Sequence, residues 1–238
     1  MAIHGGDPML MESSELRARR AVHPILAWAG IAAPVIFTAV FLVQEAFRRE
    51  EYDPLAEPVS ALEAGPAGWI QQVDFVVFGL LTIAHAIGQH AGMLATRRGV
   101  AGPALLALTG IGSLVSGFFP IREDAAGVTE IPVGHLVGGL TFFLVSPVAL
   151  ILLAGRMRRD PAWQSLARYT FVSGLVLVAL DIMTLALVFP DDGPLHDWAG
   201  LIQRITILGV LFPCRIVLAV RLLTIAGDQR RQGSGRRY

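Results

Sequence analysis

The chain has 238 residues, enough for one compact domain, and its formal net charge is zero. Its nineteen basic residues are all arginine and are spread over short segments rather than one face, so we expect no nucleic-acid partner. The single cysteine, Cys214, excludes an intramolecular disulfide and a thiolate metal cluster.

Six long apolar runs dominate the chain, and each is about 20 residues or more, which lets a helix cross about 30 Å of hydrocarbon. They are His23–Phe47, Trp69–Met93, Val100–Pro120, His135–Gly155, Leu166–Pro190 and Trp198–Ala226. The pattern predicts an all-α fold, a polytopic membrane protein with a bundle of six transmembrane helices, whose surroundings are the lipid bilayer. We expect residues 1–22 to form a cytoplasmic N-terminal segment, residues 23–226 the transmembrane domain, and residues 227–238 a disordered cytoplasmic tail.

The arginines indicate how the bundle is oriented. Fourteen lie on one side of the predicted spans, whereas only Arg48, Arg49 and Arg122 lie on the other. Because positively charged loops stay inside, both chain termini are expected in the cytoplasm. The absence of lysine, together with abundant alanine, glycine and arginine, is typical of a GC-rich bacterial genome. We therefore expect a multi-pass protein of the bacterial inner (plasma) membrane.

The first outer loop, residues 48–68, is the longest connection in the chain and carries several turn residues. Its apolar residues and prolines favour an ordered loop that covers the outer mouth of the bundle. Ser60 and Glu63 have the spacing of a capping box, so Ser60 is expected to cap the segment that follows it.

Ionisable residues inside the predicted spans are costly in a bilayer and are therefore candidates for function. At a helical rise of about 1.5 Å per residue, Asp74, Asp181 and Arg204 lie roughly 8, 13 and 9 Å below the outer ends of their spans. Asp181 and Arg204 lie on consecutive antiparallel spans, so we expect them to face inward and pair. The candidate ligand-binding residues in this layer are Ser60, Gln71, Asp74, His135, Asp181 and Arg204.

Other polar and small residues favour structural roles. His85 is expected to be a hydrogen-bonded core histidine, and the Arg215 side chain is expected to reach the inner headgroups. Glycines in the third and fourth spans, among them Gly112, Gly138 and Gly139, are interpreted as helix-packing positions.

Three short motifs resemble a known family. Residues 58–62 (PVSAL) precede the second span, residues 117–120 (GFFP) end the third, and His135 opens the fourth. Over about residues 24–225 the chain resembles the six-span prokaryotic membrane protein family catalogued as domain of unknown function 998. The resemblance implies a six-helix membrane bundle and no established activity. Ser60, Pro120 and His135 are the positions that match the family pattern.

Three classes of function stay open. We favour the binding or transport of a small anionic or lipid-like ligand through an outward-facing polar cavity. The second class is a non-catalytic structural role beside a partner membrane protein. The third is a metal-dependent intramembrane hydrolase, in which His135, His196 and Asp74 bind zinc and Ser60 or water reacts. These histidines lack the spacing of known zinc motifs, so we expect no cofactor.

Overall fold

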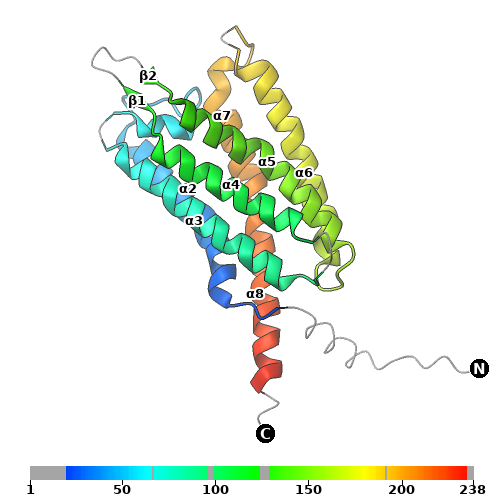
Figure 1. Cartoon of the computed structure of the whole chain (residues 1–238). Helices are drawn as coiled ribbons and strands as arrows, with labels where there is room; N and C mark the ends of the chain where they lie inside the picture. The colour runs from blue at the N-terminus through cyan, green and yellow to red at the C-terminus, as the bar shows by residue number, and fades with distance from the viewer. Residues whose placement is uncertain (1–19, 66, 96–98, 124–128, 191, 235–238) are drawn as a thin grey trace, which may run out of the picture.

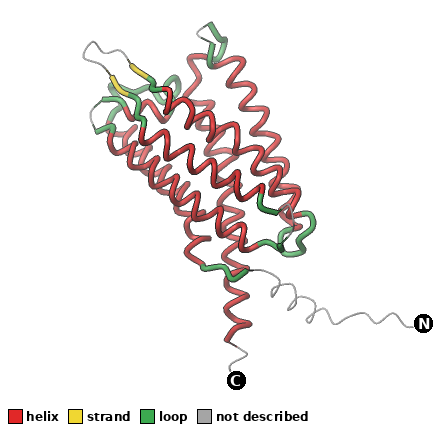
Figure 2. Tube along the Cα trace, viewed as in Figure 1, coloured by secondary structure: helices red, strands yellow, loops and turns green. Residues whose placement is uncertain are grey.

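The computed structural model describes residues 20–65, 67–95, 99–123, 129–190 and 192–234, and it consists mainly of six long helical spans (Figures 1 and 2). All six are long and apolar enough to cross a membrane, which confirms the predicted all-α membrane fold. The first four are α2 (Pro24–Phe47), α3 (Trp69–Gly92), α4 (Ala101–Phe118) and α5 (Val133–Met157). The fifth span joins α6 (Gln164–Met183) to η2 (Thr184–Val188). The sixth joins η3 (His196–Trp198), α7 (Ala199–Arg204), η4 (Ile205–Leu211) and α8 (Phe212–Ser234).

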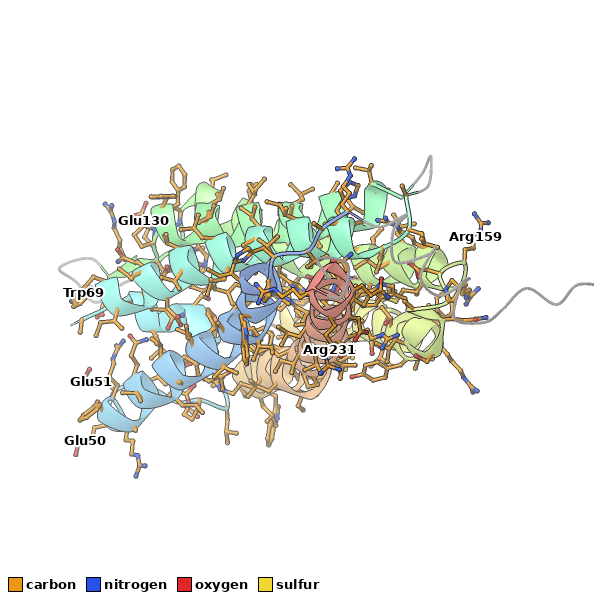
Figure 3. The ribbon with its side chains drawn as sticks, turned by 90° about the horizontal axis from the view of Figure 1, so that it is seen from below. Glu50, Glu51, Trp69, Glu130, Arg159 and Arg231 are labelled. Carbon is orange, nitrogen blue, oxygen red and sulfur yellow. The ribbon has the colours of Figure 1, made fainter. Side chains whose placement is uncertain are left out.

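The two ends of the bundle differ in charge, and we name them accordingly. The acidic end carries the loops around residues 48–68, 119–132 and 189–195, and the basic end carries the opposite loops, the start of α2 and the end of α8. Figure 3 shows Glu50, Glu51 and Glu130 at one end and Arg159 at the other. The loop between α4 and α5 forms a short antiparallel pair, β1 (Arg122–Glu123) with β2 (Thr129–Glu130). The N-terminal segment to residue 19 and the arginine pair at 97–98 lie outside the described residues.

Glycine contacts hold α4 tightly between its neighbours. A Cβ on Gly112 would meet the carbonyl oxygen of Gly138 at 2.7 Å, and a Cβ on Gly138 would meet that of Gly112 at 2.6 Å. The pair Gly79 and Gly110 makes the same reciprocal contact between α3 and α4. Because membrane helices lack a hydrophobic drive toward one another, such close backbone approach supplies the packing energy. Gly139 differs, since a Cβ there would meet nothing within 4 Å.

A buried arginine organises the basic end. Arg156 on α5 donates hydrogen bonds to the carbonyl oxygens of His90, Met93, Leu94 and Gly99, which lie at or beyond the C-terminal end of α3. These carbonyls include groups that an α-helix leaves without an internal partner at its end. Arg156 therefore ties the short connection between α3 and α4 to α5.

The sixth span extends beyond the bundle. Figure 1 shows the lower part of α8 projecting past the other helices. The helix runs to Ser234, so the disorder expected from residue 227 is wrong up to that point, and residues 235–238 lie outside the described residues. Gln229 helps to explain the extension, because its side chain accepts a hydrogen bond from the Val22 amide and donates one to the Arg20 carbonyl.

Candidate functional site

Two adjoining cavities lie in the half of the bundle nearer the acidic end. The larger, of about 220 Å³, lies between the diverging ends of α5 and the fifth span, with α7 and η4 behind it. The smaller, of about 70 Å³, lies in the centre of the bundle. Both are lined by Ser60, His135, Gly139, Phe143 and Gln203. Figure 1 shows α5 and α6 close together toward the basic end and farther apart toward the acidic end.

The larger cavity has apolar walls that continue onto the surface facing the lipid. Its lining includes Ile131, Leu136, Leu144, Leu185 and Phe189, all of which are large hydrophobic side chains with exposed surface. Toward the basic end the two helices close, because Gly174 on α6 packs against Pro147 and Ile151 of α5. The cavity is therefore a groove that ends partway across the bundle and is bounded by side chains exposed on the flank of the helices.

The inner cavity is aromatic with a few polar groups. Six phenylalanines line it: Phe37, Phe75, Phe78, Phe142, Phe143 and Phe212. Ser113 and Ser116 of α4 add hydroxyl groups, and the Ser113 hydroxyl already donates to the Phe75 carbonyl oxygen at 2.8 Å. This chamber therefore suits an apolar group better than an ion.

His135, which contacts the buried Glu63 carboxylate, forms with Ser60 and Gln203 a polar patch that lines both cavities. His135 Nδ1 lies 3.1 Å from Oε2 of Glu63 and 3.3 Å from the Ser116 carbonyl oxygen. Oε2 of Glu63 also accepts from the Ile121 amide at 3.0 Å. Because both neighbours of Nδ1 are acceptors, Nδ1 carries a proton, and Nε2 is an acceptor when the ring is neutral.

The turn after Glu63 explains why this side chain points inward. Gly65 has a φ of +77°, a conformation that favours glycine, and reverses the chain. A Cβ on Gly68 would lie 1.9 Å from the Glu63 carbonyl oxygen, so only glycine fits this close approach. The capping box expected for Ser60 and Glu63 is wrong, because Pro58 occupies the N-cap of η1 (Val59–Glu63) and Glu63 is used by His135 and Ile121.

The first loop forms a roof over the cavities, as its composition led us to expect. Val59 and Leu62 are buried, and Ser60 and Pro58 line the larger cavity. The Val59 amide donates to Oε1 of Gln203 at 2.7 Å, and the amide of Leu201 donates to the Leu55 carbonyl oxygen at 2.9 Å. The roof is thus fixed to the sixth span.

Asp181 lines the larger cavity but does not pair with Arg204. It is 8% exposed, and its Oδ2 is buried without a hydrogen-bond partner among the described residues. Arg204 instead forms an ion pair with Glu45 of α2 and donates hydrogen bonds to the Tyr52 hydroxyl and the Glu57 carbonyl oxygen. The expected Asp181–Arg204 pair is therefore wrong, because Arg204 faces α2 and the roof rather than the fifth span.

Tyr52 completes the Arg204 cluster. Its hydroxyl donates toward the carbonyl oxygens of Glu57 and Pro58, at 3.0 and 3.1 Å. Burial raises the pKa of Tyr52 to about 12, although the nearby Arg204 opposes the shift. The phenol therefore keeps its proton at physiological pH and continues to hold the roof segment.

Gln71 and Asp74 line neither cavity. Gln71 is fully buried and accepts a hydrogen bond from Nε2 of Gln44 at 2.8 Å, so it joins α2 to α3. Asp74 is 3% exposed, and both of its carboxyl oxygens lack a hydrogen-bond partner among the described residues. Of the six candidate residues, Ser60, His135 and Asp181 meet at the larger cavity, whereas Gln71, Asp74 and Arg204 lie elsewhere.

The residues of the zinc alternative do not come together. Nδ1 of His196 lies 3.0 Å from the Val188 carbonyl oxygen, and His135 is held by Glu63. Within the described part of the chain, no three His, Cys, Asp or Glu side chains are placed to hold a metal ion.

Deeper in the bundle, one structural expectation is met and one is wrong. His85 is buried, and Nε2 of Gln89 lies 3.2 Å from its Nε2, so it is a hydrogen-bonded core histidine. Arg215 does not reach the headgroups: it is 1% exposed, lies over the Phe78 ring and donates to the Thr82 hydroxyl at 2.6 Å.

Two π-helices flank the larger cavity and were not foreseen from the sequence. Thr184 and Val188 of η2 and Thr206 of η4 all line it. Pro213 offers a local cause for η4, because it cannot donate to the carbonyl four residues earlier and crowds it. The wide turns of π-helices occur frequently at functional sites.

Comparison with known proteins matches the chain to a family. The family described as "Protein of unknown function (DUF998)" matches residues 31–221, which covers all six spans at least in part. No curated protein and no solved structure matches the chain.

Proposed function

We propose that this chain, which belongs to the DUF998 family, binds an amphipathic, lipid-like molecule in the larger cavity and takes it up sideways from the bilayer. One observation carries the proposal: the groove between α5 and the fifth span joins lipid-facing apolar walls to the polar patch. An apolar chain fits the walls, and a hydrogen-bonding headgroup fits the polar patch of His135, Ser60 and Gln203.

Access from the side follows from how the roof is attached. Arg204 connects the roof to α2 and the sixth span, and Gln203 accepts from the Val59 amide. Lifting the roof would break several hydrogen bonds, some of them to a charged group, each of which contributes about 0.5–3 kcal/mol. Among the described residues, no comparable set of polar contacts joins α5 to the fifth span along the cavity. This flank is therefore the easier route for a ligand dissolved in lipid.

The ligand is lipid-like rather than a small acid. A small anion would need a cation in the cavity, and Arg204 was the candidate for that role. Its guanidinium instead contacts Glu45 and Tyr52, and the residue lines neither cavity.

Gly139 gives a direct test, because it lines both cavities and has nothing within 4 Å of an added Cβ. We expect Gly139→Leu to fill the groove without disturbing the packing between α4 and α5. The protein in nanodiscs is incubated with a photoactivatable diacylglycerol, and the cross-linked peptides are mapped. The wild type should be labelled on α5 and the fifth span, and Gly139→Leu should reduce this labelling at least about fivefold, as expected for a sterically blocked site.

Gly155→Leu is the matched control. Gly155 lies on the same helix, also has nothing within 4 Å of an added Cβ, and is far from the cavity lining. Its labelling should equal that of the wild type. Equal labelling of the wild type and Gly139→Leu, or labelling spread evenly over all lipid-facing helices, would contradict the proposal.

A further inference from the structure

The larger cavity contains a buried acid that the proposed binding function does not yet explain. Asp181 lines the groove, is 8% exposed, and has a buried carboxyl oxygen with no hydrogen-bond partner among the described residues. A buried polar group without a hydrogen-bond partner costs free energy. A ligand that donates a hydrogen bond to this carboxyl oxygen removes that cost, and the gain adds to its binding free energy.

We propose that the ligand is an amphipathic amine, whose ammonium group binds Asp181 while its apolar chain lies along the groove. This inference rests on the proposed function, because it names the chemical class of the ligand that the same cavity takes. An ammonium group is a donor only and carries the opposite charge to a carboxylate, so it forms a charge-assisted hydrogen bond there.

The other ionisable groups at the cavity do not oppose a cation. Among the residues that line the two cavities, only Asp181 and His135 are ionisable. His135 is in contact with Glu63, so with Glu63 ionised the two groups together carry a charge of zero or minus one. The cavity lining therefore offers a cation no net repulsion, and it offers an anionic headgroup no arginine or lysine.

The surroundings of Asp181 also suit an organic cation. Phe143 and Phe189 line the same groove, and aromatic faces attract cations when water is excluded. Thr184 and Thr206 line the groove as well, although their hydroxyls already donate to the carbonyl oxygens of Leu180 and Ile202. Because a hydroxyl that donates its hydrogen still has acceptor lone pairs, these two oxygens can accept hydrogen bonds from the remaining N–H groups of an ammonium.

Competition with the diacylglycerol photoprobe tests the inference on the wild-type protein. Three competitors share a twelve-carbon chain: dodecylamine, dodecanol and dodecanoate. The amine should halve the labelling at a mole fraction in the nanodisc lipid at least about tenfold below that of the alcohol, since one charge-assisted hydrogen bond is worth about a factor of ten or more. Dodecanoate should be the weakest of the three. An amine no better than the alcohol would overturn the inference.

Asp181→Asn tests the assigned residue. The advantage of the amine over the alcohol should fall at least about fivefold. Continued labelling of α5 and the fifth span by the photoprobe in this variant reports an intact groove. Asp197→Asn is the control, because Asp197 is exposed near the same end of the bundle and lines neither cavity. An unchanged amine advantage in Asp181→Asn would refute the role of Asp181.

The outcomes separate the two proposals. If the photoprobe does not label the groove, or Gly139→Leu does not reduce labelling, the binding function itself fails. If labelling depends on Gly139 but the amine has no advantage, only the amine inference fails. If Asp181→Asn does not fold, the wild-type order of the three competitors still decides the question.

Discussion

At the scale of single residues, Glu45 and Arg204 form a largely buried ion pair at the acidic end. Their side chains are only 14% and 12% exposed, and the guanidinium also lies within 6 Å of the ring centres of Phe41 and Tyr52. Removal of one partner leaves the other charge buried without compensation, which is more costly than the loss of the contact alone.

We therefore expect Glu45→Gln and Arg204→Gln each to lower the stability by about 1–3 kcal/mol. Their effects should be non-additive by at least about 0.5 kcal/mol in the double variant. Thermal unfolding in detergent measures all three proteins. The combination of Arg204→Gln with Asp181→Asn is the control and should be additive, because these two side chains do not pair. Additive effects of the Glu45 and Arg204 changes would rule out the link.

At the scale of the helices, two neighbouring glycines of α5 have opposite surroundings. Gly138 faces α4, where an added Cβ would lie 2.6 Å from the Gly112 carbonyl oxygen, whereas Gly139 faces the cavities and has free space. Backbone atoms cannot move aside as the end of a flexible side chain can, so only the first position requires glycine for packing.

Gly138→Ala should therefore lower the stability by about 1–3 kcal/mol, the usual range for overpacking. Gly139→Ala should leave it unchanged or raise it by up to about 1 kcal/mol, since alanine favours helices more than glycine does. Thermal unfolding of both variants in the same detergent provides the comparison. A similar loss in both would mean that α4 and α5 do not approach as closely as described.

At the scale of the whole molecule, we predict that the acidic end faces away from the cytoplasm. The motivation is the excess of arginine at the basic end. Native Cys214 is fully buried, so it should contribute little to the labelling measured for introduced cysteines. An impermeant thiol reagent on intact cells should label Glu50→Cys and Glu130→Cys, and should label Arg159→Cys and Arg231→Cys only after permeabilisation (Figure 3). The reverse labelling pattern would show that the acidic end faces the cytoplasm and would contradict the prediction.

Features that depend only on the length and hydrophobicity of a segment were predicted correctly, whereas contacts that depend on the rotation of a helix were not. The six spans follow from hydrophobic length, which does not depend on which face of a helix meets which neighbour. The Asp181–Arg204 pairing failed because depth along a helix was estimated and rotation about its axis was not. Arg204 pairs instead with Glu45, an acid near the end of the first span. The sequence therefore contained this alternative partner for Arg204.

The candidate cavity shows the same limit. Ser60, His135 and Asp181 could be selected because polar residues in or beside apolar spans are rare. The contact between Glu63 and His135 required knowledge of the turn at Gly65, and the two π-helices depend on backbone geometry that residue type alone does not fix. Gly139 was interpreted as a packing residue, and only the structure separates it from Gly138.

The fixed roof has a consequence for how the binding site would respond to its surroundings. Arg204 and Gln203 hold the roof on the sixth span. If the proposed ligand enters from the side beneath this roof, the bilayer rather than the water phase is its reservoir. Occupancy would then depend on the mole fraction of ligand within the membrane. Within a series of compounds with the same headgroup, apparent potency in water should rise with the membrane–water partition coefficient, even where the intrinsic affinity for the site is constant.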